Sequence, residues 1–134
     1  RKSLENTVVH ELNHTIYLYH HYDRFGDYTL FDNLIMEGLA ENFRRFILKG
    51  TLPPWTKSLN KRESMKILNE FSEILMSKDV QLISDFLFGS KKFKKWTGYS
   101  AGFHLVQEFI KCNPKFSWEK IMKSSLQEFQ KIIK

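Results

Sequence analysis

The chain has 134 residues, of which 42% are hydrophobic and 15% aromatic. This is enough for one sizeable core and predicts a single domain over residues 1–134. The lack of any run of about eighteen apolar residues excludes a membrane-spanning helix, and the single cysteine, Cys112, excludes an internal disulfide. A net charge of +6 leaves nucleic acid and acidic peptides open as partners.

The first predicted helix covers residues 4–22, with Ser3 as its N-cap and the breakers DRFGD at 23–27 after it. Its apolar residues recur at helical spacing: Leu4, Val8, Val9, Leu12, Ile16 and Tyr19. Because the chain begins at Arg1 without a methionine, we expect it to be the C-terminal part of a longer protein. The lone cysteine fits a reducing compartment, so the expected location is cytoplasmic, although an export signal could precede this segment.

The sequence HELNH at positions 10–14 lies within this helix and is an HExxH motif. Residues four apart share one face of a helix, so His10 and His14 can direct ring nitrogens at one metal ion. Glu11 follows His10 directly and can hold a water molecule and take its proton. The motif therefore predicts a zinc hydrolase site, and the alternative is a chance match on a partly exposed helix.

The second predicted helix covers residues 29–48 and supplies a candidate third ligand, since a catalytic zinc ion takes three protein ligands and a water. Its apolar side and C-terminal stop are marked by Leu30, Leu34, Ile35, Leu39, Phe43, Phe46, Ile47 and Gly50. Glu37 lies in a largely apolar stretch, where a metal ion would offset the cost of burying its charge. Glu41, one turn later, can accept a hydrogen bond from the non-liganding nitrogen of His10. Alternatively, both acids pair with Arg44 and Arg45 at the surface.

The rest of the chain predicts helices joined by short loops and no strands. The expected helix starts are Asn60 with Glu63, Asp79, Gly98, Ser117, and Ser124 or Ser125. The expected ends are Leu75, Gly89 and Lys111, and the apolar residues of the last helix are Leu126, Phe129, Ile132 and Ile133. Gly98 and Gly102 form a smooth strip for close helix packing, and Gly38 removes bulk where two helices approach across the metal.

Other polar residues give weaker signals. Tyr99 could donate its hydroxyl to an oxyanion, or it could be an ordinary core tyrosine. His104 could serve in its place, but it lies five residues further on and faces another direction, so it is expected to be structural or exposed. His20 and His21 lie too far along the helix to share a metal ion with His14. They could line a substrate cleft or face solvent, and we expect both to face solvent.

A lysine-rich loop, defined by Lys91, Lys92, Lys94 and Lys95, is interleaved with Phe93 and Trp96. Such a patch can bind nucleic acid or an anionic surface, or it can be a solvated connection. No nucleic-acid-binding motif accompanies it, so we favour the solvated loop and expect no nucleic acid partner.

Five short motifs in order carry a resemblance: HELNH at 10–14, EGLAE at 37–41, PWT at 54–56, LFG at 87–89 and WTGYSAGF at 96–103. The pattern is similar to that of gluzincin peptidases. It resembles more narrowly the bacterial family of predicted zinc-dependent proteases called domain of unknown function 2268. The resemblance implies a mainly α chain: the helical, active-site-bearing portion of a zincin-like metalloprotease domain, whose upstream sheet would lie outside it.

The same resemblance implies Zn²⁺ held by His10, His14 and Glu37, with Glu11 as general base. Many gluzincins carry aspartate where this chain has Glu41. The expected function is zinc-dependent hydrolysis of a peptide bond in a peptide or protein substrate. Two alternatives stay open: a non-proteolytic zinc amidase using the same centre, and a basic helical interaction or nucleic-acid-binding module in which HExxH is incidental.

Overall fold

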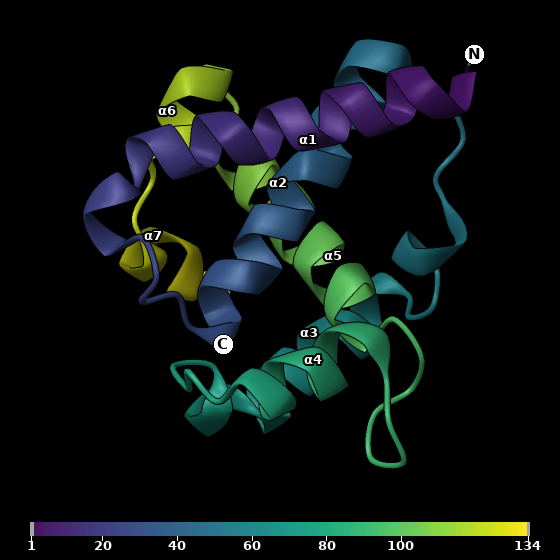
Figure 1. Cartoon of the computed structure of the whole chain (residues 1–134), viewed down its shortest axis with the longest axis vertical. Coiled ribbons are helices and arrows are strands. Elements are labelled where there is room, and N and C mark those ends of the chain that lie inside the picture. The colour runs from purple at the N-terminus through teal and green to yellow at the C-terminus, as the bar shows by residue number, and fades with distance from the viewer. Residues whose placement is uncertain (1, 134) are drawn as a thin grey trace.

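The computed structural model describes residues 2–133, which form helices and, within that range, no strand. Figure 1 shows how the helices are arranged. The α-helices are α1 (Lys2–His20), α2 (Leu30–Leu48), α3 (Lys61–Glu70), α4 (Val80–Phe88), α5 (Thr97–Cys112), α6 (Trp118–Lys123) and α7 (Leu126–Gln130); short 3-10 helices η1, η2 and η3 cover Tyr22–Arg24, Pro54–Thr56 and Ser72–Ile74. The expected mainly α architecture is confirmed.

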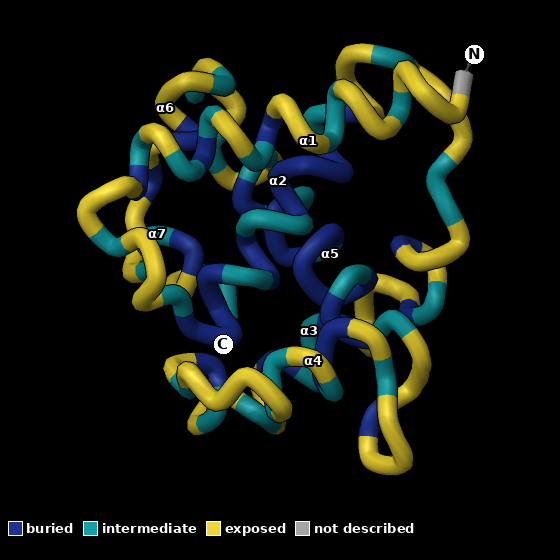
Figure 2. The backbone as a smooth tube through the Cα atoms, in the orientation of Figure 1, coloured by how far each residue is buried: buried dark blue, intermediate teal, exposed yellow. Residues whose placement is uncertain are grey.

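Helices α2 and α5 form the centre of the molecule, and their backbones touch. A Cβ atom built on Gly38 would lie 2.1 Å from the carbonyl oxygen of Gly102, and one on Gly102 would lie 2.2 Å from the carbonyl oxygen of Leu34. Only glycine permits this approach. Figure 2 shows both helices as mostly buried. The prediction for Gly102 is confirmed, whereas Gly38 meets α5 and not the helix that carries the HExxH motif.

Helix α1 lies across α2 and α6 (Figure 1), and its orientation differs from the one that its apolar spacing suggests. Its buried side chains include Asn13 and Tyr17, and Asn13 donates to the sulfur of Met122 in α6 at 3.5 Å. The outer face carries four exposed apolar residues: Leu4, Val8, Leu12 and Tyr19. The apolar spacing therefore predicts that this segment is a helix but not which of its faces is buried. The face that packs against the protein is the one that carries the histidines.

His21 is buried, which corrects the expectation that it faces solvent. Its Nε2 lies 2.8 Å from the carbonyl oxygen of Met122, and its ring stacks on Tyr17 at 4.2 Å between centroids. This histidine holds the end of α1 against α6, which makes it a structural residue.

Side-chain caps fix most helix starts as predicted. Side chains of Thr29, Asn60, Asp79, Ser117 and Ser125 accept backbone N–H groups at the starts of α2, α3, α4, α6 and α7. Three ends differ: Lys49 takes the left-handed conformation after α2 in place of Gly50, α3 ends at Glu70 before η3, and α7 ends at Gln130.

No helix among residues 2–133 has the length and hydropathy needed to cross a bilayer. Cys112 lies exposed at the end of α5.

Candidate metal centre and its cleft

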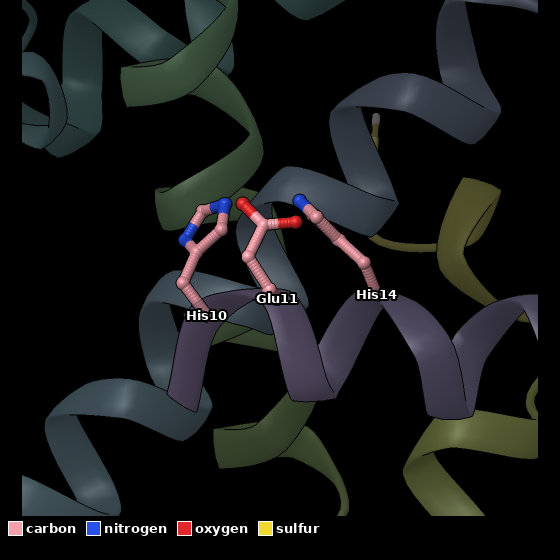
Figure 3. Close-up of side chains that lie close together, drawn as sticks. All are labelled: His10, Glu11 and His14. Atoms are coloured by element: carbon pink, nitrogen blue, oxygen red, sulfur yellow. The ribbon is translucent and has the colours of Figure 1, made fainter. Parts of the chain in front are cut away.

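Helix α1 presents the three motif residues on one side. The rings of His10 and His14 are 4.5 Å apart between centroids and nearly perpendicular, at 83°. One ligand atom from each of His10, Glu11 and His14 lies within 4.8 Å of the others. Figure 3 shows the three side chains extending the same way from the helix. The i,i+4 spacing thus gives the shared direction expected from the sequence.

Helix α2 brings Glu37 against both imidazoles. Its Oε2 lies 3.2 Å from Nε2 of His10, and its Oε1 lies 3.5 Å from Nε2 of His14. The Glu37 side chain is only 13% exposed. Two nitrogens from one helix and a carboxylate from another therefore lie close together.

Glu11 and Glu37 are both close enough to the histidines to be the carboxylate ligand, but their surroundings differ. Glu11 is exposed and lines a cleft, so it can meet water and substrate. Glu37 is enclosed between the rings, and its Oε2 is buried without hydrogen-bond geometry to any group among residues 2–133. A buried carboxylate oxygen without a hydrogen bond is costly, so Glu37 is the better candidate for a cation ligand.

Glu41 fixes the orientation of the His10 ring by contacting Nδ1, the ring nitrogen that does not face Glu37. Its Oε1 lies 2.9 Å from Nδ1 of His10 and accepts a hydrogen bond from Nε1 of Trp55 at 3.1 Å. Its Oε2 accepts from Nε of Arg44 at 3.1 Å, and the Glu41 side chain is only 1% exposed. Glu41 therefore contacts His10 and also pairs with Arg44, but it does so as a buried residue and not at the surface.

The tautomer that Glu41 imposes shows that these residues suit a cation. Because Nδ1 of His10 donates to Glu41, Nε2 of the neutral ring carries a lone pair, and that lone pair faces the Glu37 carboxylate. Two acceptors at 3.2 Å repel each other unless a positive charge lies between them. A proton or a metal ion supplies that charge, and the two imidazoles with a carboxylate match the donor set of zinc.

The pKa values follow from this arrangement. Burial disfavours the charged form of His10, but contacts with Glu37 and Glu41 outweigh it and raise the pKa of the imidazole to about 9. Burial also disfavours charge on Glu37, but His10 and His14 outweigh it and lower the pKa of that carboxyl to about 2. In the same way, the pKa of Glu41 is lowered, because hydrogen bonds from His10 and Trp55 outweigh its burial.

A cleft of about 590 Å³ opens beside His10 and Glu11. It is lined by residues of α1, α2, α4, α5 and the segment after α2; those used below are Trp55, Phe88, Trp96 and Tyr99. Because this cleft exposes Glu11 and one side of His10, a substrate can reach the motif from it.

Tyr99 lies in this cleft with its ring 5.6 Å from Phe88. Burial and the charges of Glu37, Glu41 and Glu11 raise the pKa of its hydroxyl, which therefore stays protonated and can donate. His104 lies elsewhere, with Nε2 at 3.2 Å from the carbonyl oxygen of Leu59. Of the two oxyanion candidates from the sequence, only Tyr99 is near the carboxylates.

Trp55 belongs to the site, although sequence reasoning gave it no role there. It lies in η2, where Pro53 and Pro54 turn the chain back toward α2. A proline pair shortly after the helix that carries Glu37 and Glu41 is a signal that could have placed this indole near Glu41.

The lysine-rich loop interacts largely with the protein itself. Lys92 lies over the rings of Phe71 and Phe93, Lys95 lies 4.3 Å from the ring centroid of Trp96, and Lys94 donates to the carbonyl oxygen of Ser58. These contacts give the lysines a local packing role.

The fold and the site together define a helical chain with an HExxH motif whose two histidines contact a glutamate from a second helix, which makes a candidate metal site. The chain belongs to the family called domain of unknown function 2268, described as predicted zinc-dependent proteases, whose model matches residues 1–131. The family resemblance noted in the sequence is thereby confirmed.

Two curated relatives come from Bacillus subtilis (strain 168). Uncharacterized protein YjfC is 29% identical over 123 residues, covering 80% of this chain and 40% of its own length. Uncharacterized protein YjaZ is 32% identical over 114 residues, covering 81% of this chain and 42% of its own. The chain thus spans about two fifths of these relatives. No solved structure matches it.

Proposed function

We propose that this chain carries the active site of a zinc-dependent peptidase that hydrolyses peptide bonds in a peptide or protein substrate. The observation that supports this most strongly is the contact of the Glu37 carboxylate with Nε2 of both His10 and His14, beside the exposed Glu11. The family description as zinc-dependent proteases agrees with it.

His10, His14 and Glu37 would hold the zinc ion. When bound, zinc supplies a Lewis acid that polarises a carbonyl group and lowers the pKa of water. Glu41 holds the His10 ring through Nδ1 so that Nε2 stays directed at the centre. Arg44 and Trp55 both donate to Glu41, which keeps that carboxylate charged and in place.

Glu11 is the general base. Its carboxylate is accessible from the cleft, takes a proton from the attacking water and returns it to the nitrogen of the leaving amine. Tyr99, protonated and in the same cleft, donates to the carbonyl oxygen as negative charge develops there. One group thus moves the proton while the other stabilises the oxyanion.

Matched Glu→Gln variants test these assignments. Glu11→Gln is expected to keep stoichiometric zinc and to lose at least about 1,000-fold in kcat, since the base is removed and the ligands remain. Glu37→Gln is expected to lose the metal as well as the activity. Zinc content by elemental analysis and cleavage of a quenched-fluorescence peptide library measure the two effects.

Three outcomes contradict the proposal in different ways. Full activity of Glu11→Gln would refute the base assignment, and full zinc content of Glu37→Gln would refute the third ligand. Turnover of amino-acid amides or formyl-peptides, with no cleavage of any longer peptide, would favour the amidase alternative. Zinc-free protein that binds RNA or DNA in a salt-sensitive way would favour the interaction module.

A further inference from the structure

Four aromatic side chains line the cleft beside the metal centre, and we call Trp55, Phe88, Trp96 and Tyr99 the aromatic wall. They come from η2, the end of α4, the start of α5 and its first turn. Trp55 lies close to the reacting groups, because Glu41 Oε1 contacts both the Trp55 indole and the ring of His10.

The rings of the aromatic wall contact each other in pairs but keep open surface. Phe88 and Tyr99 are 5.6 Å apart between centroids, and Trp55 and Trp96 are 6.3 Å apart with their planes at 74°. Phe88 is 52% exposed and Trp55 36% exposed. Exposed aromatic surface in a concave site is the kind of surface that apolar ligand groups bury.

The backbone holds this wall in place before any ligand binds. The N–H of Trp96 donates to the carbonyl oxygen of Phe88 at 3.0 Å. Gly89 has a φ of 106°, and a Cβ there would lie 2.6 Å from the Cα of Lys95. The two ends of the loop between α4 and α5 are therefore in close contact. Trp96 adopts a φ of 62°, a left-handed conformation that is uncommon for an aromatic residue. The hydrogen bond, the close approach at Gly89 and the left-handed conformation of Trp96 together hold Phe88 and Trp96 side by side.

Charge in the cleft does not favour a charged side chain at this wall. Of the acids that line the cleft, Glu41 is already paired with His10 and Arg44, and Glu11 is the base. Arg44 lines the cleft but is occupied by Glu41 and by the side-chain oxygen of Asn6. Among the described residues that line the cleft, none therefore offers an unpaired cation or a second free carboxylate for a charged substrate group.

We propose that the aromatic wall is the subsite for a large apolar side chain, such as phenylalanine or leucine, next to the scissile bond of the substrate. The proposal deepens the proposed peptidase function and rests on it. It makes Phe88 the chief residue that determines specificity, because this ring is the most exposed of the wall and has no part in holding Glu41.

Peptide binding tests the subsite separately from hydrolysis. The probes are blocked hexapeptides of one sequence in which a single position is phenylalanine, leucine, alanine or glutamate. Binding is measured by calorimetry to zinc-loaded Glu11→Gln, which does not turn over, and cleavage is measured with the unsubstituted chain. The phenylalanine and leucine peptides are expected to bind about 10- to 100-fold tighter than the alanine and glutamate peptides.

Two changes at Phe88 and one control make the test specific. Phe88→Ala is expected to remove most of the preference, and Phe88→Lys to shift it toward the glutamate peptide. Phe46→Ala, which removes a similarly exposed phenylalanine of α2 that does not line the cleft, is expected to keep it. Circular dichroism checks that each variant folds. The lysine of Phe88→Lys is compatible with the helix, because a positive charge is favourable in the last turn of α4.

Each result supports or overturns the subsite. Equal binding of all four peptides, or a preference that Phe88→Ala and Phe88→Lys leave unchanged, overturns it. A preference that depends on Phe88, in a chain that cleaves none of the peptides, supports the subsite and contradicts the peptidase function. Cleavage without regard to the varied side chain supports the peptidase function and overturns the subsite.

Discussion

The imidazole of His10 lies between two carboxylates, and this determines its chemistry. Glu41 contacts Nδ1 at 2.9 Å and Glu37 lies 3.2 Å from Nε2, so one acid fixes the tautomer and the other meets the remaining lone pair. His14 has no comparable support, because its Nδ1 is buried without a hydrogen-bond partner among residues 2–133. The two histidines are equivalent in the motif but are held differently in the fold.

This asymmetry predicts a large effect at Glu41. Glu41→Gln is expected to weaken zinc binding by about 10- to 100-fold, since the amide can no longer accept equally from His10, Trp55 and Arg44. Competition with a chromophoric chelator measures the affinity. Glu119→Gln, on the exposed face of α6, is the matched control and should bind zinc normally. Equal affinity in both variants would show that Glu41 does not support the ligand.

At the scale of elements, the contact between α2 and α5 positions Glu37. Gly38 follows this residue directly, and its contact with the carbonyl oxygen of Gly102 sets how close the two helices lie. Helix α1 then packs across α2, which brings the HExxH motif over the carboxylate. The position of Glu37, and with it the candidate metal centre, thus depends on the close packing of the neighbouring Gly38 against α5.

Gly38→Ala is therefore expected to destabilise the protein by about 3 kcal/mol or more, since overpacking against backbone atoms cannot be relieved by a rotamer change. Urea unfolding followed by circular dichroism measures the loss. Gly50→Ala is the control, because a Cβ there meets nothing within 4 Å, and it should change stability by less than about 0.5 kcal/mol. Similar stability of the two variants would contradict the close packing.

At the scale of the whole molecule, the charges of the centre link stability to pH. The pKa of His10 is raised to about 9, so the folded state holds a proton that the unfolded chain releases near 6.5. This contribution is complete below the unfolded value and is lost as the pH rises through about 9. The pKa of Glu37 is lowered to about 2, so its contribution is lost as the pH falls from about 4.5 toward 2.

The metal-free protein should therefore be most stable between about pH 4.5 and 6.5 as far as this centre is concerned. Urea midpoints in the presence of a chelator measure the profile. His10→Gln should flatten the fall above about pH 6.5, whereas His20→Gln, at a half-buried histidine at the end of α1, should leave that fall in place. A midpoint in the unsubstituted chain that rises between about pH 6.5 and 9.5 would contradict the assigned ion pair.

The local signals in the sequence predicted most of the helix starts and the contact of Glu37 with the two histidines of the motif. The caps at Asn60, Asp79 and Ser117 were readable because each is a local contact between neighbours in the chain. The pairing of HExxH with Glu37 was readable because metal chemistry limits which residue types can meet. The place of Trp55 near the site and the burial of His21 could not be predicted from the sequence, since each depends on a contact with a distant segment.

The sequence by itself determined the helices, the motif geometry along α1 and the identity of the acid on α2, because spacing along one helix sets which side chains share a face. Only the tertiary structure decided which face of α1 is buried. It directs the histidines inward and leaves Leu4, Val8 and Leu12 exposed. The physical reason is that buried polar groups must find partners, and Glu37 and Glu41 supply those partners on one side of α1 alone.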